Sequence, residues 1–238
     1  MSRFRRVAGR VRRRLQRALP GAAPSAPVQR RWDAAAVADF EALKDEYRLV
    51  FQTMASATVA SWEVSASELH RRLKPRLGVE EAATQIERFS DALVPSLSVL
   101  QTTERGVSEL WPKVEAAGAE HDSVAQALAL LAAHSRGLGR AFEEDWPKTV
   151  EYLGPVLDVI AVSDAGRQEL LEIGAAVRRG LDSSSEAFGQ SLAGVAVADR
   201  IAQAFLEATD GYRHGAAREV EMALHKVEQV IVRAADAD

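Results

Sequence analysis

The sequence predicts an all-α protein, in which an N-terminal amphipathic helix precedes long, kinked antiparallel helices that form an elongated bundle or coiled coil. Apolar residues recur three and four positions apart along most of the chain, whereas the period-two alternation of half-buried strands does not occur. The 15 glycines and 8 prolines are clustered, so long stretches contain neither. Aromatic residues make up only 6% of the chain, which is low for a β-rich protein.

Composition divides the 238 residues into three predicted parts. Residues 1–19 are a basic amphipathic helix, residues 20–31 are a Pro/Ala-rich linker, and residues 32–238 are an acidic all-helical bundle domain. The first 32 residues hold ten arginines and no acid, which leaves 20 basic and 34 acidic residues in the remainder. This asymmetry indicates a membrane or nucleic-acid partner for the basic segment, because the acidic body alone would repel both.

The N-terminal arm, residues 1–19, separates apolar from basic side chains. At 100° per residue its apolar residues fall within an arc of roughly 120°, and arginines fill the rest of the helix surface. An apolar stripe flanked by arginine suits the boundary between anionic headgroups and acyl chains, so we expect the arm to bind an anionic membrane surface. The candidate lipid-binding residues are Arg3, Phe4, Arg5, Arg6, Val7, Arg10, Val11, Arg12, Arg13, Arg14, Leu15, Arg17 and Leu19.

Other interpretations of the arm stay open. An Arg-rich, acid-free amphipathic segment also resembles a mitochondrial transit peptide, although this one is poor in Ser and Thr. Ten arginines would bind nucleic-acid phosphates, but the arm offers Phe4 alone for stacking, and an apolar stripe has no use on a duplex. A disordered basic tail is a further alternative, and the clean separation of the two faces argues against it.

A Pro-rich linker and a long helix follow the arm. Three prolines within residues 20–27 cannot continue a helix. Residues 28–74 contain neither Pro nor Gly, and their 3-4-3-4-3 apolar spacing predicts a coiled-coil-like seam. The helix ends in a basic stretch before Gly78, which is an ordinary stop signal. The seam consists of Phe40, Leu43, Tyr47, Val50, Met54 and Ala57.

Several turns or kinks are predicted in the remaining helical stretches. Pro95 should kink the second stretch, and a break is expected around 117–118. Heptad spacing resumes near Val124, and Gly154-Pro155 reads as the next breaker. Polar residues 182–185 and Asp210-Gly211 predict further turns. Two layouts remain, namely an antiparallel bundle of four or five helices, or three very long helices over roughly 33–77, 79–153 and 155–235.

The three-helix layout resembles the N-BAR type of membrane-curving protein. The resemblance lies in the order and length of elements, and it implies a dimer through the long helices, a crescent shape and membrane binding. One departure concerns residues 151–155, at the junction of the second and third helices. That junction has no Lys or Arg, whereas the family carries a basic tip there. The elements that carry the likeness are the arm Ser2–Leu19, a helix near 33–74, and kinks at Pro95, Pro112, Pro147 and Pro155.

No motif for catalysis, metal binding or cofactor binding is found in the sequence. The absence of cysteine excludes disulfides, thiolate ligands and thiolate nucleophiles. No Gly-rich phosphate loop, HExxH or Gly-x-Ser-x-Gly occurs, and the histidines lack the Glu-x-x-His spacing of di-iron bundles. The pairs Asp210/His214 and Glu221/His225 and the run 143–145 are expected to face solvent. The tryptophans are expected to be packing residues, with Trp32 as a candidate interfacial anchor.

These observations predict a non-enzymatic peripheral membrane protein on the cytoplasmic side, with no cofactor and no small-molecule substrate. No run of about 18 apolar residues occurs, so no transmembrane helix is expected. A homodimer through the long helices is expected, and nucleic acid is not the favoured partner. The alternative is a helical adaptor or cargo protein whose arm is a targeting or nucleic-acid-binding element. A helical-bundle enzyme with a pocket that the sequence does not reveal is a third class.

Overall fold

A computed structural model describes residues 28–236, and this part of the chain is helical apart from short connections. No strand occurs among the described residues, so the prediction of an all-α fold is confirmed for residues 28–236. The arm with its candidate lipid-binding residues lies outside the described range, as does most of the linker. The helices are α2 (Ala34–Leu77), α3 (Val79–Asp91), α4 (Val94–Glu120), α5 (Val124–Val159), α6 (Asp164–Val195) and α7 (Ile201–Asp236).

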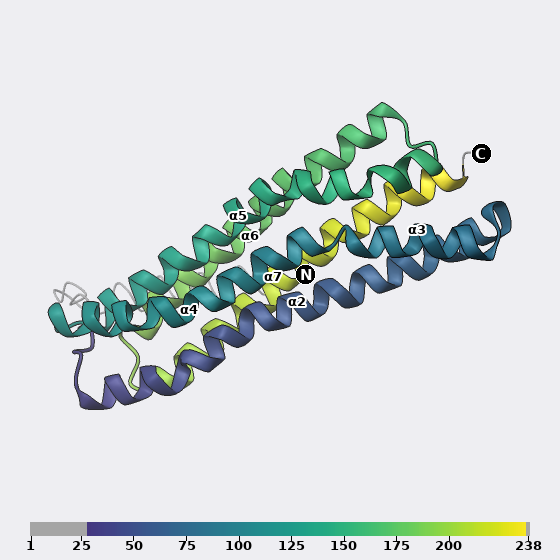
Figure 1. Cartoon of the computed structure of the whole chain (residues 1–238). Helices are drawn as coiled ribbons and strands as arrows, with labels where there is room; N and C mark the ends of the chain where they lie inside the picture. The colour runs from purple at the N-terminus through teal and green to yellow at the C-terminus, as the bar shows by residue number, and fades with distance from the viewer. Residues whose placement is uncertain (1–27, 237–238) are drawn as a thin grey trace, which may run out of the picture.

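Helices α3 and α4 form one bent rod, so residues 28–236 make five rods that run up and down an elongated bundle (Figure 1). Each rod packs against the next one in the chain, and α7 packs against α2, which closes the rods into a ring around the core. Because the number of rods is odd, α2 and α7 run parallel. The rings of Phe40 and Phe205 lie 6.0 Å apart near the starts of these two helices, and Arg72 pairs with Asp236 near their ends.

The chain reverses direction four times, so the bundle layout is observed and the three-helix layout is wrong for residues 28–236. The reversals lie at Gly78 and at residues 121–123, 160–163 and 196–200. Gly78 has a φ of 83°, a backbone conformation that glycine adopts without steric cost. It lets α3 begin directly after α2. The layout that supports the resemblance to N-BAR proteins is therefore replaced by shorter rods.

Three predicted breaks are wrong, because buried residues on both sides keep the helix continuous. Helix α5 runs through Gly154-Pro155, α6 runs through residues 182–185, and α7 runs through Asp210-Gly211. Leu153 and Val156 flank the first of these breaks and are fully buried. Burial of each such side chain is worth about 1.5–3 kcal/mol, which offsets the roughly 3 kcal/mol cost of a proline inside a helix.

The other predicted interruptions lie close to observed ones. The chain bends at residues 92–93, and Pro95 occupies the first turn of α4, where a missing N–H group costs little. The predicted kink is therefore confirmed to within three residues. The break expected around 117–118 occurs slightly later, because α4 continues to Glu120.

Tryptophans anchor the core at several levels of the bundle. Trp62, Trp111 and Trp146 are at most 3% exposed, so the prediction that they are packing residues is confirmed. Nε1 of Trp146 donates to the carbonyl oxygen of Leu170 at 2.7 Å. Helix α6 can approach this ring because it carries Gly174, where an added Cβ would lie 2.7 Å from Cδ1 of Trp146.

We predict that Gly174→Ala destabilises the bundle by about 1–3 kcal/mol, because the added methyl group overpacks against a buried, hydrogen-bonded indole. Urea unfolding measures the effect. Gly137→Ala is the matched control, since Gly137 is an exposed helical glycine with nothing within 4 Å of an added Cβ. It should stabilise the protein by about 0.5–1 kcal/mol. Equal effects of both substitutions would contradict the close packing at Trp146.

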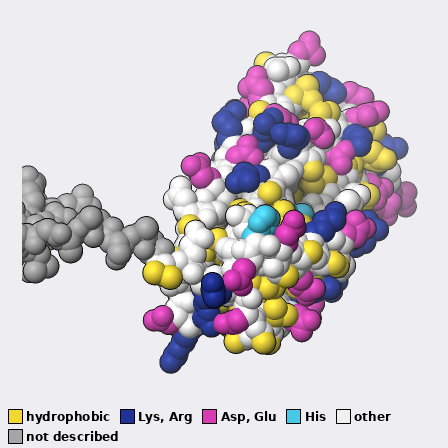
Figure 2. Space-filling view, turned by 90° about the vertical axis from the view of Figure 1, so that its left-hand side faces the viewer, with side chains coloured by type: hydrophobic (Ala, Val, Ile, Leu, Met, Phe, Trp, Pro, Cys, Tyr) yellow, Lys and Arg dark blue, Asp and Glu magenta, His cyan; other side chains and the backbone are white. Residues whose placement is uncertain are grey.

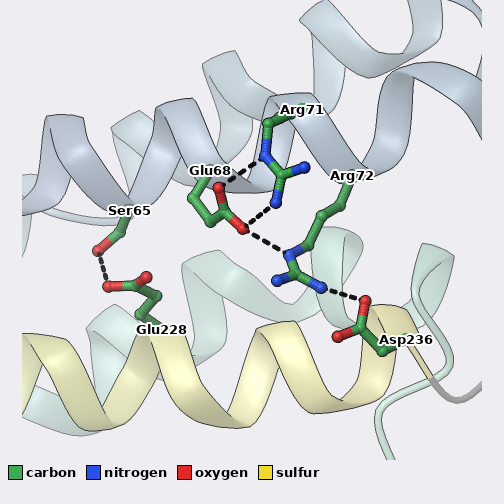
Figure 3. Close-up of polar contacts among 6 residues, drawn as sticks. All are labelled: Ser65, Glu68, Arg71, Arg72, Glu228 and Asp236. Carbon is green, nitrogen blue, oxygen red and sulfur yellow. Dashed lines mark hydrogen bonds and ion pairs between the residues drawn. The ribbon is translucent and has the colours of Figure 1, made fainter.

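A charged cluster joins the C-terminal parts of α2 and α7 (Figure 3). The Glu68 carboxylate accepts hydrogen bonds from Arg71 at 2.7 Å and from Arg72 at 2.8 Å. Arg72 also pairs with Asp236 of α7. The hydrogen bonds from the two arginines lower the pKa of Glu68 to about 2. The carboxylate therefore stays charged in the folded protein far below the pH at which an ordinary glutamate is protonated.

The stabilising effect of Glu68 should disappear in acid. Its folded-state pKa of about 2 lies below the ordinary value, so its contribution is present above about pH 4.5 and is lost as the pH falls toward 2. We predict that Glu68→Gln lowers the melting temperature at pH 7, and that the difference from the wild type shrinks through this window. Glu63→Gln is the control, because Glu63 is exposed on the same helix and has no ion pair among the described residues. A constant difference across the window would contradict the assignment.

Candidate functional site: the N-terminal strap and the groove between α5 and α6

Residues 28–33, which we call the strap, cross one end of the bundle and tie the chain to two turns. The backbone N–H of Arg30 donates to the carbonyl of Ala196 at 2.9 Å, and the carbonyl of Arg30 accepts from the N–H of Val124 at 3.3 Å. The guanidinium of Arg30 donates to the carbonyl of Asp199 at 2.8 Å. The chain that precedes the strap is therefore joined to the bundle at this end.

Trp32 holds the strap against the core. Its ring centroid lies 5.1 Å from that of Phe40, and the indole covers Gly118 so closely that an added Cβ there would collide with it. Asp33 then caps α2, since its carboxylate accepts from the N–H of Ala36 at 2.9 Å. The ring of Trp32 is half-buried and packs inward, as expected of a packing residue, and its role as an interfacial anchor stays a prediction.

The end of the bundle that carries the strap mixes charges of both signs. Figure 2 shows basic and acidic side chains interspersed over this face, with apolar atoms between them. Arg31 and Asp122, both largely exposed, form an ion pair of 3.3 Å. Among the described residues neither sign dominates this face. Attraction to a strongly charged surface would therefore have to come from the arm.

A groove of about 940 Å³ lies between α5 and α6 and begins at the strap, where Gln29 lines it. In its first half the walls are mostly small and uncharged, and we call this part the apolar half. The two helices approach closely here, since a Cβ added to Gly189 would lie 3.7 Å from Cβ of Ala132. The residues of the apolar half are Ala125, Leu128, Ala129, Ala132, Gly189, Leu192, Ala193 and Ala196, together with the polar Gln190.

The remaining part of the groove, the charged half, carries groups of both signs. Arg178 donates to Glu143 at 2.5 Å and to Asp182 at 3.4 Å. The hydrogen bond to Glu143 is the main cause that raises the pKa of Arg178 above its ordinary value. The guanidinium is thus held in place by two carboxylates. The residues that line the charged half are Arg136, Arg140, Arg178, Asp182 and Glu186.

A polar network beneath the groove belongs to the core. The hydroxyl of Tyr47 lies 3.1 Å from Nδ1 of His134 and donates to the carbonyl of Leu131 at 3.3 Å. Ser185 donates to the carbonyl of Ser135 at 3.0 Å. Burial lowers the pKa of His134 and raises the pKa of Tyr47 well above its ordinary value. Both rings are therefore neutral near pH 7, as suits packing residues better than an acid–base pair.

Protonation of His134 should oppose folding. Its pKa in the folded protein is lowered, so the unfolded chain binds the proton more readily and stability falls as the pH drops below about 6.5. We predict that His134→Gln makes this decline shallower, by at most about 1.4 kcal/mol per pH unit. Chemical unfolding between pH 7 and 5 measures the slope of the free energy of unfolding against pH. His121→Gln, at an exposed turn position, is the control for replacing a histidine outside the core. Identical slopes in all three proteins would contradict a buried neutral His134.

The other polar residues singled out from the sequence are in ordinary surface contacts. Asp210 and His214 lie 3.5 Å apart and face solvent, as predicted. His225 pairs with Glu228 at 3.5 Å in place of Glu221. The acidic run 143–145 is engaged with cations, because Glu143 pairs with Arg178 and Asp145 pairs with Lys148. Residues 28–236 contain no group of three or more His, Asp or Glu that could hold a metal ion.

Sequence reasoning missed both the strap and the groove. Four strap residues, Val28 to Arg31, fall inside the segment predicted as linker. The signal that could have found the strap is Trp32-Asp33, an apolar residue directly before a helix cap. For the groove, small residues with the same 4-3 spacing, at 125/129/132 and at 189/193/196, could have shown that two helices carry similar faces.

Comparison with known proteins finds no matching family model, no similar curated protein and no similar solved structure. Within residues 28–236, no helix combines the length and the apolar character that a membrane span requires.

Proposed function

We propose that this is a non-enzymatic peripheral membrane protein whose arm binds anionic lipid as an amphipathic helix, while the helical bundle serves as a scaffold at the surface. The observation that carries this proposal is the pattern of residues 1–19, where an apolar stripe is flanked by eight arginines. A lipid interface accommodates both faces at once, because apolar side chains enter the acyl region while guanidinium groups remain among the headgroups.

The strength of binding follows from two contributions. A basic residue near an anionic leaflet is worth about 1 kcal/mol, so at half that value eight arginines contribute about 4 kcal/mol. Burial of the stripe adds to this, since it carries Phe4, Val7, Val11, Leu15 and Leu19. Together these terms give useful affinity without a protein receptor.

The attachment point and the charges of the bundle support different roles for the arm and the body, with the arm binding lipid and the body serving as scaffold. The strap ties the arm to one end of the bundle, and residues 20–27 can span up to about 26 Å when extended. The chain after residue 32 holds 34 acidic and 20 basic residues, so an anionic surface would attract the arm and repel the body. The body would then stand off the lipid and present its rods to partners. A homodimer and the shaping of membranes stay predictions.

Vesicle co-sedimentation tests the proposal with two matched variants of the arm. The triple variant Val7→Ser, Val11→Ser and Leu15→Ser breaks the stripe and keeps every charge. The variant Arg10→Gln, Arg12→Gln, Arg13→Gln and Arg14→Gln keeps the stripe and removes charge. We predict that the full-length wild type binds anionic vesicles, that high salt weakens this binding, and that each variant loses about tenfold or more, equivalent to about 1.4 kcal/mol.

Two exposed arginines of the body supply the control. Arg179→Gln with Arg218→Gln removes the same kind of charge from the described surface and should leave vesicle binding unchanged. Equal losses of vesicle binding in the arm and body variants would show that the protein binds vesicles by unspecific charge attraction and not through the arm. If the wild type binds neither anionic nor neutral vesicles, the membrane proposal is wrong. Binding to nucleic acid, or removal of the arm in cells, would then favour the adaptor or targeting alternative.

A further inference from the structure

We infer that the apolar half of the groove between α5 and α6 is the docking site of the arm's own C-terminal half, residues 11–19, in the absence of a membrane. The inference rests on the proposed function, because it assigns a resting position to the segment that would bind lipid. The bundle would thus hold its membrane-binding element until an anionic surface competes for it.

The linker and the strap keep residues 11–19 within reach of the groove. Gln29 lines the groove, and the strap is fixed there by the hydrogen bonds of Arg30. Residues 20–27 can span up to about 26 Å, so they comfortably reach along the apolar half. A connection of only eight residues keeps the segment close to the groove and raises its effective concentration there, so even weak docking is populated.

The dimensions and side chains of the two surfaces match. Ala125 and Ala132 are seven residues apart on α5, so the apolar half is about 10 Å long. Val11 and Leu19 are eight residues apart, which is about 12 Å along a helix. The arm presents branched apolar side chains, whereas the walls of the apolar half are mostly Ala and Gly. Large residues facing small ones is the arrangement by which helices interdigitate.

Charge limits docking to the apolar half. Arg136 and Arg140 lie beyond Ala132 on α5, have no hydrogen bond or ion pair within the described residues, and would repel the arm's arginines. On the facing wall Glu186 is likewise unpaired within the described chain and would attract them. Over the whole molecule the body carries 14 more acidic than basic residues after position 32, which favours association with a basic segment.

Docking and lipid binding would exclude each other, because both use the same apolar stripe. The apparent affinity for a membrane is then reduced by the fraction of protein in which the arm is free. Anionic surfaces would release the arm more effectively than neutral ones, since they also attract its arginines. The groove therefore gives the bundle a means of making membrane attachment selective for anionic lipid.

Engineered cysteine pairs in the full-length chain test the inference, because the natural chain contains no cysteine. The docking pair is Val11→Cys with Ala129→Cys. The matched control pair is Val11→Cys with Leu206→Cys. Ala129 lies five residues into α5 and Leu206 five residues into α7, so both lie at the same depth from the strap end but on different faces. Disulfide formation with oxidised glutathione is followed without lipid and with anionic vesicles.

Without lipid, the docking pair should form its disulfide about tenfold faster than the control pair, equivalent to about 1.4 kcal/mol of docking free energy. Anionic vesicles should slow disulfide formation in the docking pair to the rate of the control pair, because lipid binding removes the arm from the groove. Equal rates without lipid would overturn the inference, as would a fast rate that vesicles leave unchanged while the protein co-sediments with them. If the protein fails to co-sediment, the proposed function fails, and the rates without lipid still decide whether the arm docks.

Discussion

The packing of α2 against α7 is the contact on which the rest of the structure depends. Most other helix contacts join rods that follow one another in the chain, whereas this one joins residues about 165 positions apart, such as Phe40 and Phe205. Closing so long a stretch costs chain entropy. Aromatic packing near the starts of α2 and α7, together with the Arg72–Asp236 ion pair near their ends, offsets that cost. Without this closure the apolar faces of five rods would not surround one core.

Ring closure also determines where the arm is attached. Phe40 packs against Phe205 on one side and against Trp32 on the other, so the strap is held by the same aromatic cluster that closes the ring. Arg30 then binds the turn at residues 196–200. The arm consequently joins the bundle at one end, beside the groove between α5 and α6. A membrane-binding arm at this place would orient the bundle with that end toward the lipid.

Local features of the fold could be predicted from the sequence, and long-range ones could not. The seam from Phe40 to Met54 and the kink near Pro95 follow from spacing and from proline geometry, and both are observed. Gly154-Pro155 did not end α5, because buried neighbours outweigh local propensity. The groove exists only once α5 and α6 are packed together. Periodicity within one helix contains no information about which faces of different helices meet.

Energy transfer from each end of the bundle to the membrane is the most direct test of the account. A donor dye on Glu120→Cys marks the strap end and one on Val79→Cys marks the opposite end, with acceptor lipid in anionic vesicles. The rods are long enough to separate the two, since the 44 residues of α2 extend about 66 Å. We predict strong energy transfer to the lipid from the dye at position 120 and weak transfer from the dye at position 79. Equal or reversed transfer would contradict attachment through the strap end.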